Sequence, residues 1–140
     1  MNITELSPFS QTLAKTKEWL EDVQEELNLE DGHDAYVALR AVLHMVRDRL
    51  AVEEAAGLGA QLPMIIRGFY YEGWTPSGKP VKVRTQEEFL EGVAENLQRD
   101  KMNPRHITQG VLKSLEKHVS NGEINDIKSN MPESLLGLWL

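Results

Sequence analysis

The sequence predicts an all-α protein in which two tandem, similar four-helix units pack into one helical, bundle-like domain. The first observation is an internal repeat: residues 19–27 align with residues 89–97 at a shift of 70, with five of nine positions identical. Matches from residue 42 onward fall at a shift of 69, so the second copy lacks one loop residue. Repeats of this kind occur where a unit cannot bury its apolar face alone and packs against its copy. The second observation is that apolar residues recur at spacings of three, four and seven, which are helical.

These observations define the expected organisation of the chain. We expect a single helical domain over residues 1–140, with internal repeats at 9–71 and 85–140 joined by a loop at 72–84. A domain of this length buries about two-thirds of the surface of its unfolded chain. The fold therefore rests on one packed core shared by the two copies.

In the first copy, Ser7 and Pro8 predict the start of a helix, with the serine as cap and the proline at the first helical position. Its apolar face comprises Phe9, Leu13, Leu20, Val23 and Leu27. Gly32 interrupts this pattern, and Asp34 is placed to cap a second helix. The apolar face of that helix comprises Leu39, Val42, Leu43, Val46 and Leu50. A short third helix is predicted over residues 52–61, and Pro63 begins a fourth.

The connection between the copies contains two glycines and two prolines within residues 72–80, which break every helical period. Residues 80–84 form the one segment whose alternation approaches that of a strand. Capping residues and prolines then mark the helix starts of the second copy. They are Thr85 with Glu88, Asn103 with Pro104, Ser120 with Glu123, and Pro132.

The composition is that of a soluble globular protein, with 41% hydrophobic and 26% charged residues. The sequence contains no run of about 18 apolar residues, and its first residues lack the pattern of a signal peptide. We therefore expect a cytoplasmic protein that makes no membrane contact. It has no cysteine, which excludes disulfides, thiolate metal ligands and a cysteine nucleophile.

The net charge of −7 is unevenly distributed. Residues 1–74 carry 13 acids and 6 bases, whereas residues 75–140 carry 9 of each. Nonspecific affinity for nucleic acid comes mainly from cations that displace the counterions of phosphates. The charge balance therefore argues against nucleic acid as a partner, although a local basic face stays open.

One candidate for such a face is the stripe of Arg40, His44 and Arg47, which falls on one side of the second helix. The aligned residues of the second copy are Gln109, Lys113 and Glu116, so the repeat does not require the positive charge. A set that differs between matching copies is a better functional candidate than one that they share. The alternative is a solvated face paired with nearby acids, which is common and contributes little to stability.

The segment from Arg67 to Trp74 crowds aromatic side chains beside an arginine and two glycines. Phe69 and Tyr70 are expected in the core, because Leu138 and Trp139 are their counterparts. Tyr71 and Trp74 suit a binding surface, since such rings combine a large contact area with a polar tip. We therefore predict a surface that recognises a protein partner. Its residues are Arg40, Arg47, Arg67, Tyr71 and Trp74, and the first four align with Gln109, Glu116, Leu136 and Leu140.

No cofactor or metal is expected, and no catalytic motif is present. The four histidines, His33, His44, His106 and His118, have no histidine partner at a helical spacing of three or four. The sequence lacks a phosphate-binding loop, a dinucleotide-binding glycine fingerprint, a nucleophile elbow and a zinc-protease motif. We therefore expect a protein that is not an enzyme.

Residues 38–50 and 60–74 together resemble the bacterial family filed as domain of unknown function 2267. The resemblance extends over nearly the whole chain. It implies a bacterial, cytosolic, helical protein but no activity, and no functional residues are carried over from it.

The main functional hypothesis is a non-enzymatic module for protein interaction or regulation, with a homodimer among the partners considered. The alternative is a DNA-associated regulator that uses a basic helix face with Arg40, Arg47 and Arg49. A third hypothesis is a small-ligand binder or enzyme in a cleft between the copies, with Arg67 as the anion anchor. The hypotheses differ in whether the arginines form one open basic patch or are each matched by a partner.

Overall fold

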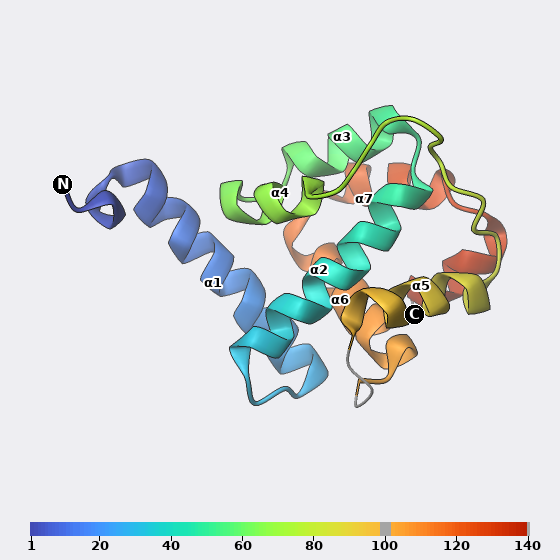
Figure 1. Ribbon diagram of the computed structural model, residues 1–140, viewed down its shortest axis with the longest axis horizontal. Helices are drawn as coiled ribbons and strands as arrows, with labels where there is room; N and C mark the ends of the chain where they lie inside the picture. Colours follow the sequence, from blue (N-terminus) through green and yellow to red (C-terminus); the bar gives the residue numbers. More distant parts are fainter. Residues whose placement is uncertain (99–101, 140) are drawn as a thin grey trace.

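The computed structural model describes residues 1–98 and 102–139, and all regular elements in these ranges are helices (Figure 1). In chain order they are η1 (Ile3–Glu5), α1 (Ser7–Leu27), α2 (Gly32–Arg49), α3 (Val52–Ala60), α4 (Met64–Tyr71), α5 (Gln86–Leu97), α6 (Pro104–His118), α7 (Asn121–Ser129) and η2 (Glu133–Trp139). The helices pack into a bundle-like domain, which confirms the predicted all-α class. No helix in the described ranges is both long and apolar enough to cross a membrane.

The first two helices begin differently from the prediction. Ser7 does not cap α1; it is the first helical residue, Leu6 holds the cap position, and the Ser7 hydroxyl accepts a bond from the Gln11 amide. Helix α2 begins at Gly32, and the carboxylate of Asp31 accepts a bond from the backbone N–H of His33 at 2.9 Å. The cap predicted at Asp34 is therefore wrong. The N–H groups of the first helical turn have no acceptor within the helix. A glycine at the first helical position therefore weakens the helix little.

The starts of α5, α6 and α7 confirm the capping predictions. In each helix, the side-chain oxygen of the cap residue accepts a bond from the backbone N–H of the third helical residue. The pairs are Thr85 with Glu88 (3.2 Å), Asn103 with His106 (3.1 Å) and Ser120 with Glu123 (3.2 Å).

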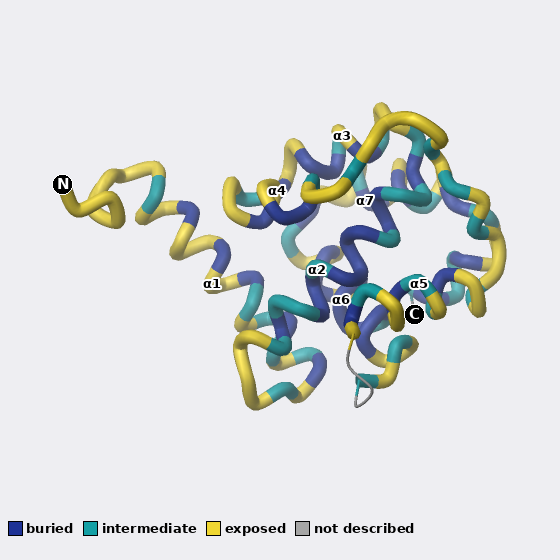
Figure 2. Tube along the Cα trace, in the orientation of Figure 1, coloured by how far each residue is buried: buried dark blue, intermediate teal, exposed yellow. Residues whose placement is uncertain are grey.

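The core lies between helices of the two halves, and Figure 2 shows buried positions concentrated on α2 and α6. Helix α1 packs on α6, α5 packs on α2, α2 also packs on α6, and α3 packs on α7. Trp19 of α1 stacks on the ring of His118 at the end of α6 with centroids 4.6 Å apart, and His118 Nε2 lies 2.5 Å from Asp22 Oδ2. Each half therefore covers apolar surface of the other.

This packing has the pattern expected of two related units. Exchanging the halves converts the α1–α6 contact into the α5–α2 contact and leaves α2–α6 and α3–α7 unchanged. Helix ends correspond at the shift of 69, since α2 and α3 end at residues 49 and 60, and α6 and α7 at residues 118 and 129. Glu54 and Glu123 align at the same shift, and burial and then the charge of Glu54 raise the pKa of Glu123. These features support the repeat, which stays a prediction.

The linker between the halves is attached to the end of α2. Residues 80–84, which approach a strand pattern, form no strand. The N–H of Val81 instead donates to the carbonyl of Asp48 at 2.9 Å, and Arg49 Nε donates to the carbonyl of Val83 at 2.7 Å. Because these bonds satisfy the linker backbone, no neighbouring strand is needed.

Helix α1 extends beyond its counterpart in the second half. It has 21 residues, whereas α5 has 12, and Gln86 at the start of α5 aligns with Thr16 at the shift of 70. Residues 7–15 therefore have no helical counterpart. In Figures 1 and 2 this part of α1 projects from the body of the molecule and is largely exposed.

Candidate functional site

Arg47 is buried, with 4% of its surface exposed, so its predicted place on an open face is wrong. Its Nη1 donates to the carbonyls of Tyr70 and Glu72, the latter at 2.7 Å, and its Nε donates to Asp48 Oδ1 at 3.1 Å. The last carbonyls of a helix have no intrahelical donor. Arg47 supplies donors to these groups at the end of α4.

His44 also forms a hydrogen bond with a carbonyl at the end of α4. It is 7% exposed, and its Nε2 donates to the carbonyl of Phe69 at 2.7 Å. Burial lowers the pKa of His44, so the neutral ring is favoured in the fold. Two members of the predicted stripe, His44 and Arg47, therefore face α4 rather than solvent.

Arg67 serves the end of α3 in a similar way. Its Nε donates to the carbonyl of Gly59 at 2.8 Å, and its Nη2 donates to the carbonyls of Leu62 at 2.8 Å and Ala60 at 3.3 Å. This guanidinium is occupied by backbone oxygens. Nothing in this placement brings it into a cleft between the halves.

Tyr71 and Trp74 are partly buried and pack against the core, which contains the buried Phe69 and Tyr70 expected there. The rings of Tyr71 and Trp74 lie 5.6 Å apart, and Trp74 Nε1 is buried without a hydrogen-bond partner among the described residues. The phenol of Tyr71 lies over Gly59, where a Cβ atom would overlap it. Leu140, which aligns with Tyr71, lies outside the described residues.

Arg40 is placed differently from the other arginines of this region. Its Nε lies 3.5 Å from Glu72 Oε1, and the two side chains are 35% and 58% exposed. Arg40, Arg47, Arg49 and Arg67 thus do not form one open basic patch, because the last three donate to backbone carbonyls. This arrangement provides no basic helix face of the kind that the DNA-associated alternative needs.

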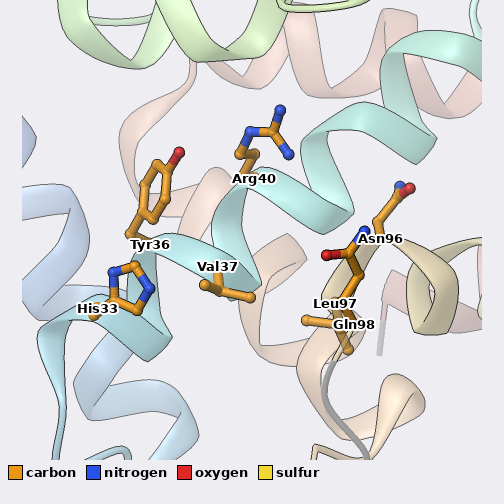
Figure 3. Close-up of a pocket in the computed structure, with 7 residues that line it drawn as sticks. All are labelled: His33, Tyr36, Val37, Arg40, Asn96, Leu97 and Gln98. Carbon is orange, nitrogen blue, oxygen red and sulfur yellow. The ribbon is translucent and has the colours of Figure 1, made fainter.

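Arg40 also lines a cleft of about 380 Å³ between α2 and the end of α5, which we call the α2–α5 cleft. Its lining residues are His33, Tyr36, Val37, Arg40, Asn96, Leu97 and Gln98. In Figure 3, the side chains of Tyr36 and Arg40 project from α2 to the same side. Asn96 and Gln98 lie beside α2, at the end of α5. The cleft lies between α2 of the first half and α5 of the second, and among the described residues its arginine is Arg40 and not the Arg67 of the third hypothesis.

A second feature is a set of exposed apolar side chains on η1, α1 and α4, which we call the α1–α4 apolar face. Its exposed members are Ile3, Leu6, Leu13, Met64 and Ile65, and the partly buried Phe9 lies among them. Leu13 is 45% exposed and Met64 49%, and a groove of about 250 Å³ runs between the two helices. The N–H of Ile65 donates to the buried Thr12 hydroxyl at 3.1 Å, which fixes α4 against α1.

Sequence periodicity does not distinguish this face from the core. Phe9 and Leu13 continue the same apolar stripe as Val23 and Leu27, which are buried. The one available signal is that residues 7–15 have no helical counterpart in the second copy, so no symmetry-related helix is expected to cover them.

The comparisons with known proteins identify a family without an assigned activity. A family model described as "Uncharacterized conserved protein (DUF2267)" matches residues 16–138. The chain belongs to this family. No curated protein matches the chain.

The two candidate sites of this DUF2267 member differ in their relation to the matched region. The α2–α5 cleft lies entirely within residues 16–138, whereas the α1–α4 apolar face crosses the start of that range. Its α4 members lie inside the range, and its η1 and α1 members lie before residue 16. No group of three or more histidines, aspartates or glutamates within the described residues could hold a metal ion.

Proposed function

We propose that this DUF2267 member is a non-enzymatic protein-interaction module and that the α1–α4 apolar face is its contact surface. The observation that carries the proposal is the gathering of large exposed apolar side chains around one groove, including Ile3, Leu13, Met64 and Ile65. Single exposed apolar residues are ordinary, but a contiguous exposed set is typical of an interaction site.

The scarcity of charged side chains near this face favours an apolar contact. Residues 1–14 contain one charged side chain, Glu5, whereas eight acids lie between Glu18 and Asp34. Few charges lose their hydration when the face is covered, so the hydrophobic gain is not offset by desolvation.

The partner that we propose is a second copy of the chain. A twofold contact must be complementary to itself. An antiparallel pair of α1 helices centred on Gln11 places Phe9 of each copy opposite Leu13 of the other. The same pairing brings Glu5, on η1 just before α1, to the end of the contact that carries Lys17 of the other copy, so opposite charges meet at both ends. Lys17 lines a groove with Leu13, which places it beside the apolar contact.

Sedimentation velocity of the full chain over a range of concentrations tests this proposal. We expect a concentration-dependent dimer, and we expect Leu13→Lys to weaken it by about tenfold or more, since a charge in an apolar contact is costly. Val52→Lys is the matched control, because Val52 is also exposed, at 37%, but lies on α3 outside the face.

The charge pairing gives a second, independent test. Glu5→Lys should weaken the dimer, and the double variant Glu5→Lys, Lys17→Glu should restore it, because the opposite charges are exchanged. A chain that stays monomeric up to about 1 mM, where even weak specific contacts are populated, would contradict self-association. Equal effects of Leu13→Lys and Val52→Lys would contradict the assignment of the face.

Two further expectations belong to this proposal. A bacterial, cytoplasmic origin is supported by the family resemblance, and fractionation of the native cells with an antibody to the protein tests it. The expectation that nucleic acid is not a partner is supported by the engagement of Arg47, Arg49 and Arg67 with backbone carbonyls. Affinity for random duplex DNA in the micromolar range, with a steep dependence on salt, would contradict it.

A further inference from the structure

Arg40 has guanidinium N–H groups that make no hydrogen bond with a described residue, unlike the neighbouring arginines Arg47 and Arg67. Its one ion pair with a described residue is the 3.5 Å approach of Nε to the exposed carboxylate of Glu72. Its Nη1 and Nη2 groups make no hydrogen bond with any described residue, whereas Nη1 of Arg47 and Nη2 of Arg67 bind carbonyls. Because a guanidinium binds planar oxyanions through paired N–H groups, Arg40 presents an available anion contact.

Arg40 lines the α2–α5 cleft together with apolar and polar side chains. Val37 and the buried Leu97 form the apolar part of its wall. The Tyr36 hydroxyl has no hydrogen-bond partner among the described residues, and its ring is held edge-on against Phe69 with centroids 5.1 Å apart. A site with an apolar wall and a few convergent polar groups is typical of small-molecule binding.

The amides at the end of α5 complete the polar lining. Asn96 Nδ2 donates to the carbonyl of Ala41 at 3.2 Å, which fixes the side chain and leaves its Oδ1 as an acceptor. The side-chain amide of Gln98 makes no bond to a described residue and can donate or accept. The cleft therefore offers a cation and a hydroxyl donor from α2 and an acceptor from α5.

We propose that the α2–α5 cleft binds a small organic anion, whose carboxylate or phosphate group contacts Arg40 and Tyr36 and whose polar remainder contacts Asn96 and Gln98. This site is separate from the α1–α4 apolar face, so the proposal does not depend on self-association. Glu72 competes with the ligand for Arg40. Because Glu72 is 58% exposed, its carboxylate can leave Arg40 for water when the anion binds.

Nuclear magnetic resonance of the ¹⁵N-labelled full chain tests the proposal. The probes are inorganic phosphate and succinate, titrated at constant ionic strength so that screening does not change. We expect saturable shifts of the Arg40 Nε–H and of the Asn96 and Gln98 side-chain amides with at least one probe. The two titrations distinguish a phosphate site from a carboxylate site.

Variants separate the cleft from the rest of the surface. Arg40→Gln should weaken binding by about tenfold or more, since the charge and the paired donors are lost. Tyr36→Phe should weaken it severalfold while retaining the packed ring. Glu72→Gln should strengthen it, because the competing carboxylate is removed. Arg105→Gln is the matched control, as Arg105 is exposed on α6 and bonds only Gln86 among the described residues.

Three results would overturn the proposal. The first is the absence of saturable shifts with both probes. The second is equal affinity in the parent chain and Arg40→Gln. The third is weaker binding in Glu72→Gln, which would mean that the carboxylate helps to hold the ligand. The amide spectrum of each variant, compared with that of the parent, shows whether the fold is retained.

Discussion

Arg47 joins α2 to the end of α4 through backbone carbonyls of Tyr70 and Glu72. A buried carbonyl without a donor loses its hydrogen bond to water and gains nothing in return, at a cost of about 1–3 kcal/mol. The charge of the guanidinium is partly balanced by Asp48, the next residue in the helix. The contribution of Arg47 is therefore to stability, and it depends on the donors at Nη1 and Nε.

We predict that Arg47→Met lowers the free energy of unfolding by about 2–4 kcal/mol, because carbonyls at the end of α4 lose their donors. Arg40→Met is the control, and it should change the free energy by under about 0.5 kcal/mol, since its single ion pair is exposed. Urea denaturation followed by circular dichroism measures both values. Similar losses in the two variants would contradict the distinction between a buried and an available arginine.

His44 makes stability depend on pH. Burial lowers its pKa, as do the charges of Arg47 and Arg40, while the bond to the Phe69 carbonyl and the charge of Asp48 oppose this effect. The unfolded chain takes up a proton near pH 6.5, whereas the folded chain does so at a lower pH. Between these values the unfolded state binds more protons, so its population is favoured as the pH falls.

We therefore predict that the contribution of His44 is fully present above about pH 6.5 and is lost as the pH falls through the folded pKa. Urea midpoints measured from about pH 8 to about pH 5 follow this change. His44→Gln retains a donor for the carbonyl and should flatten the dependence, whereas the exposed His106→Gln should not. An unchanged slope in His44→Gln would assign the dependence to other groups.

At the scale of the element, the contact of α1 with α6 requires a glycine. A Cβ atom at Gly110 of α6 would overlap the side chain of Leu27 at the end of α1, and both positions are buried. Gly68 of α4 has no neighbour within 4 Å of the same position. Close packing therefore requires a glycine at position 110 but not at position 68, although both residues lie within helices.

We predict that Gly110→Ala lowers the free energy of unfolding by about 1–3 kcal/mol, as overpacking of a buried contact does. Gly68→Ala should be neutral or stabilise the fold by up to about 1 kcal/mol, because alanine favours the helix and meets open space. Chemical denaturation of the two variants measures the difference. A stabilised Gly110→Ala would mean that Leu27 moves aside without loss.

Local signals predicted the helix starts best where the cap and its partner are neighbours in sequence. Thr85, Asn103 and Ser120 confirmed this, since each bonds an N–H a few residues away. Gly32 misled the prediction for α2, because a glycine inside a helix and one at its first position look alike in sequence. The general class and the order of helices thus followed from local chemistry and spacing.

The candidate sites were harder to predict, because their partners are distant in sequence. The bonds from His44 and Arg47 to α4 span 23 to 25 residues, and nothing near the two side chains in sequence indicates them. Arg40 is also an arginine of α2, like Arg47, but its side chain lines the cleft. Periodicity shows which residues share a face, but tertiary packing decides which part of that face is covered.

At the scale of the whole molecule, the two halves depend on one another. Helices α1 and α2 of the first half pack on α6 and α5 of the second. We predict that a fragment of residues 1–75 does not melt cooperatively near the temperature of the full chain, because the apolar faces that α5 and α6 cover are left exposed. Mixing it with a fragment of residues 76–140 should restore a cooperative transition. Circular dichroism measures both, and a cooperative 1–75 fragment of equal stability would contradict a shared core.

The packing of each half on the other also affects folding during synthesis. A ribosome releases α1 and α2 first, whereas α5 and α6, which cover them, follow only after the linker. At about 5–20 residues per second, the stretch from Leu27 to His118 takes on the order of 5 to 20 seconds to synthesise. During this time the nascent chain carries apolar helix faces without their final partners. We expect the soluble yield in a foreign host to depend on chaperones that hold such segments until the second half emerges.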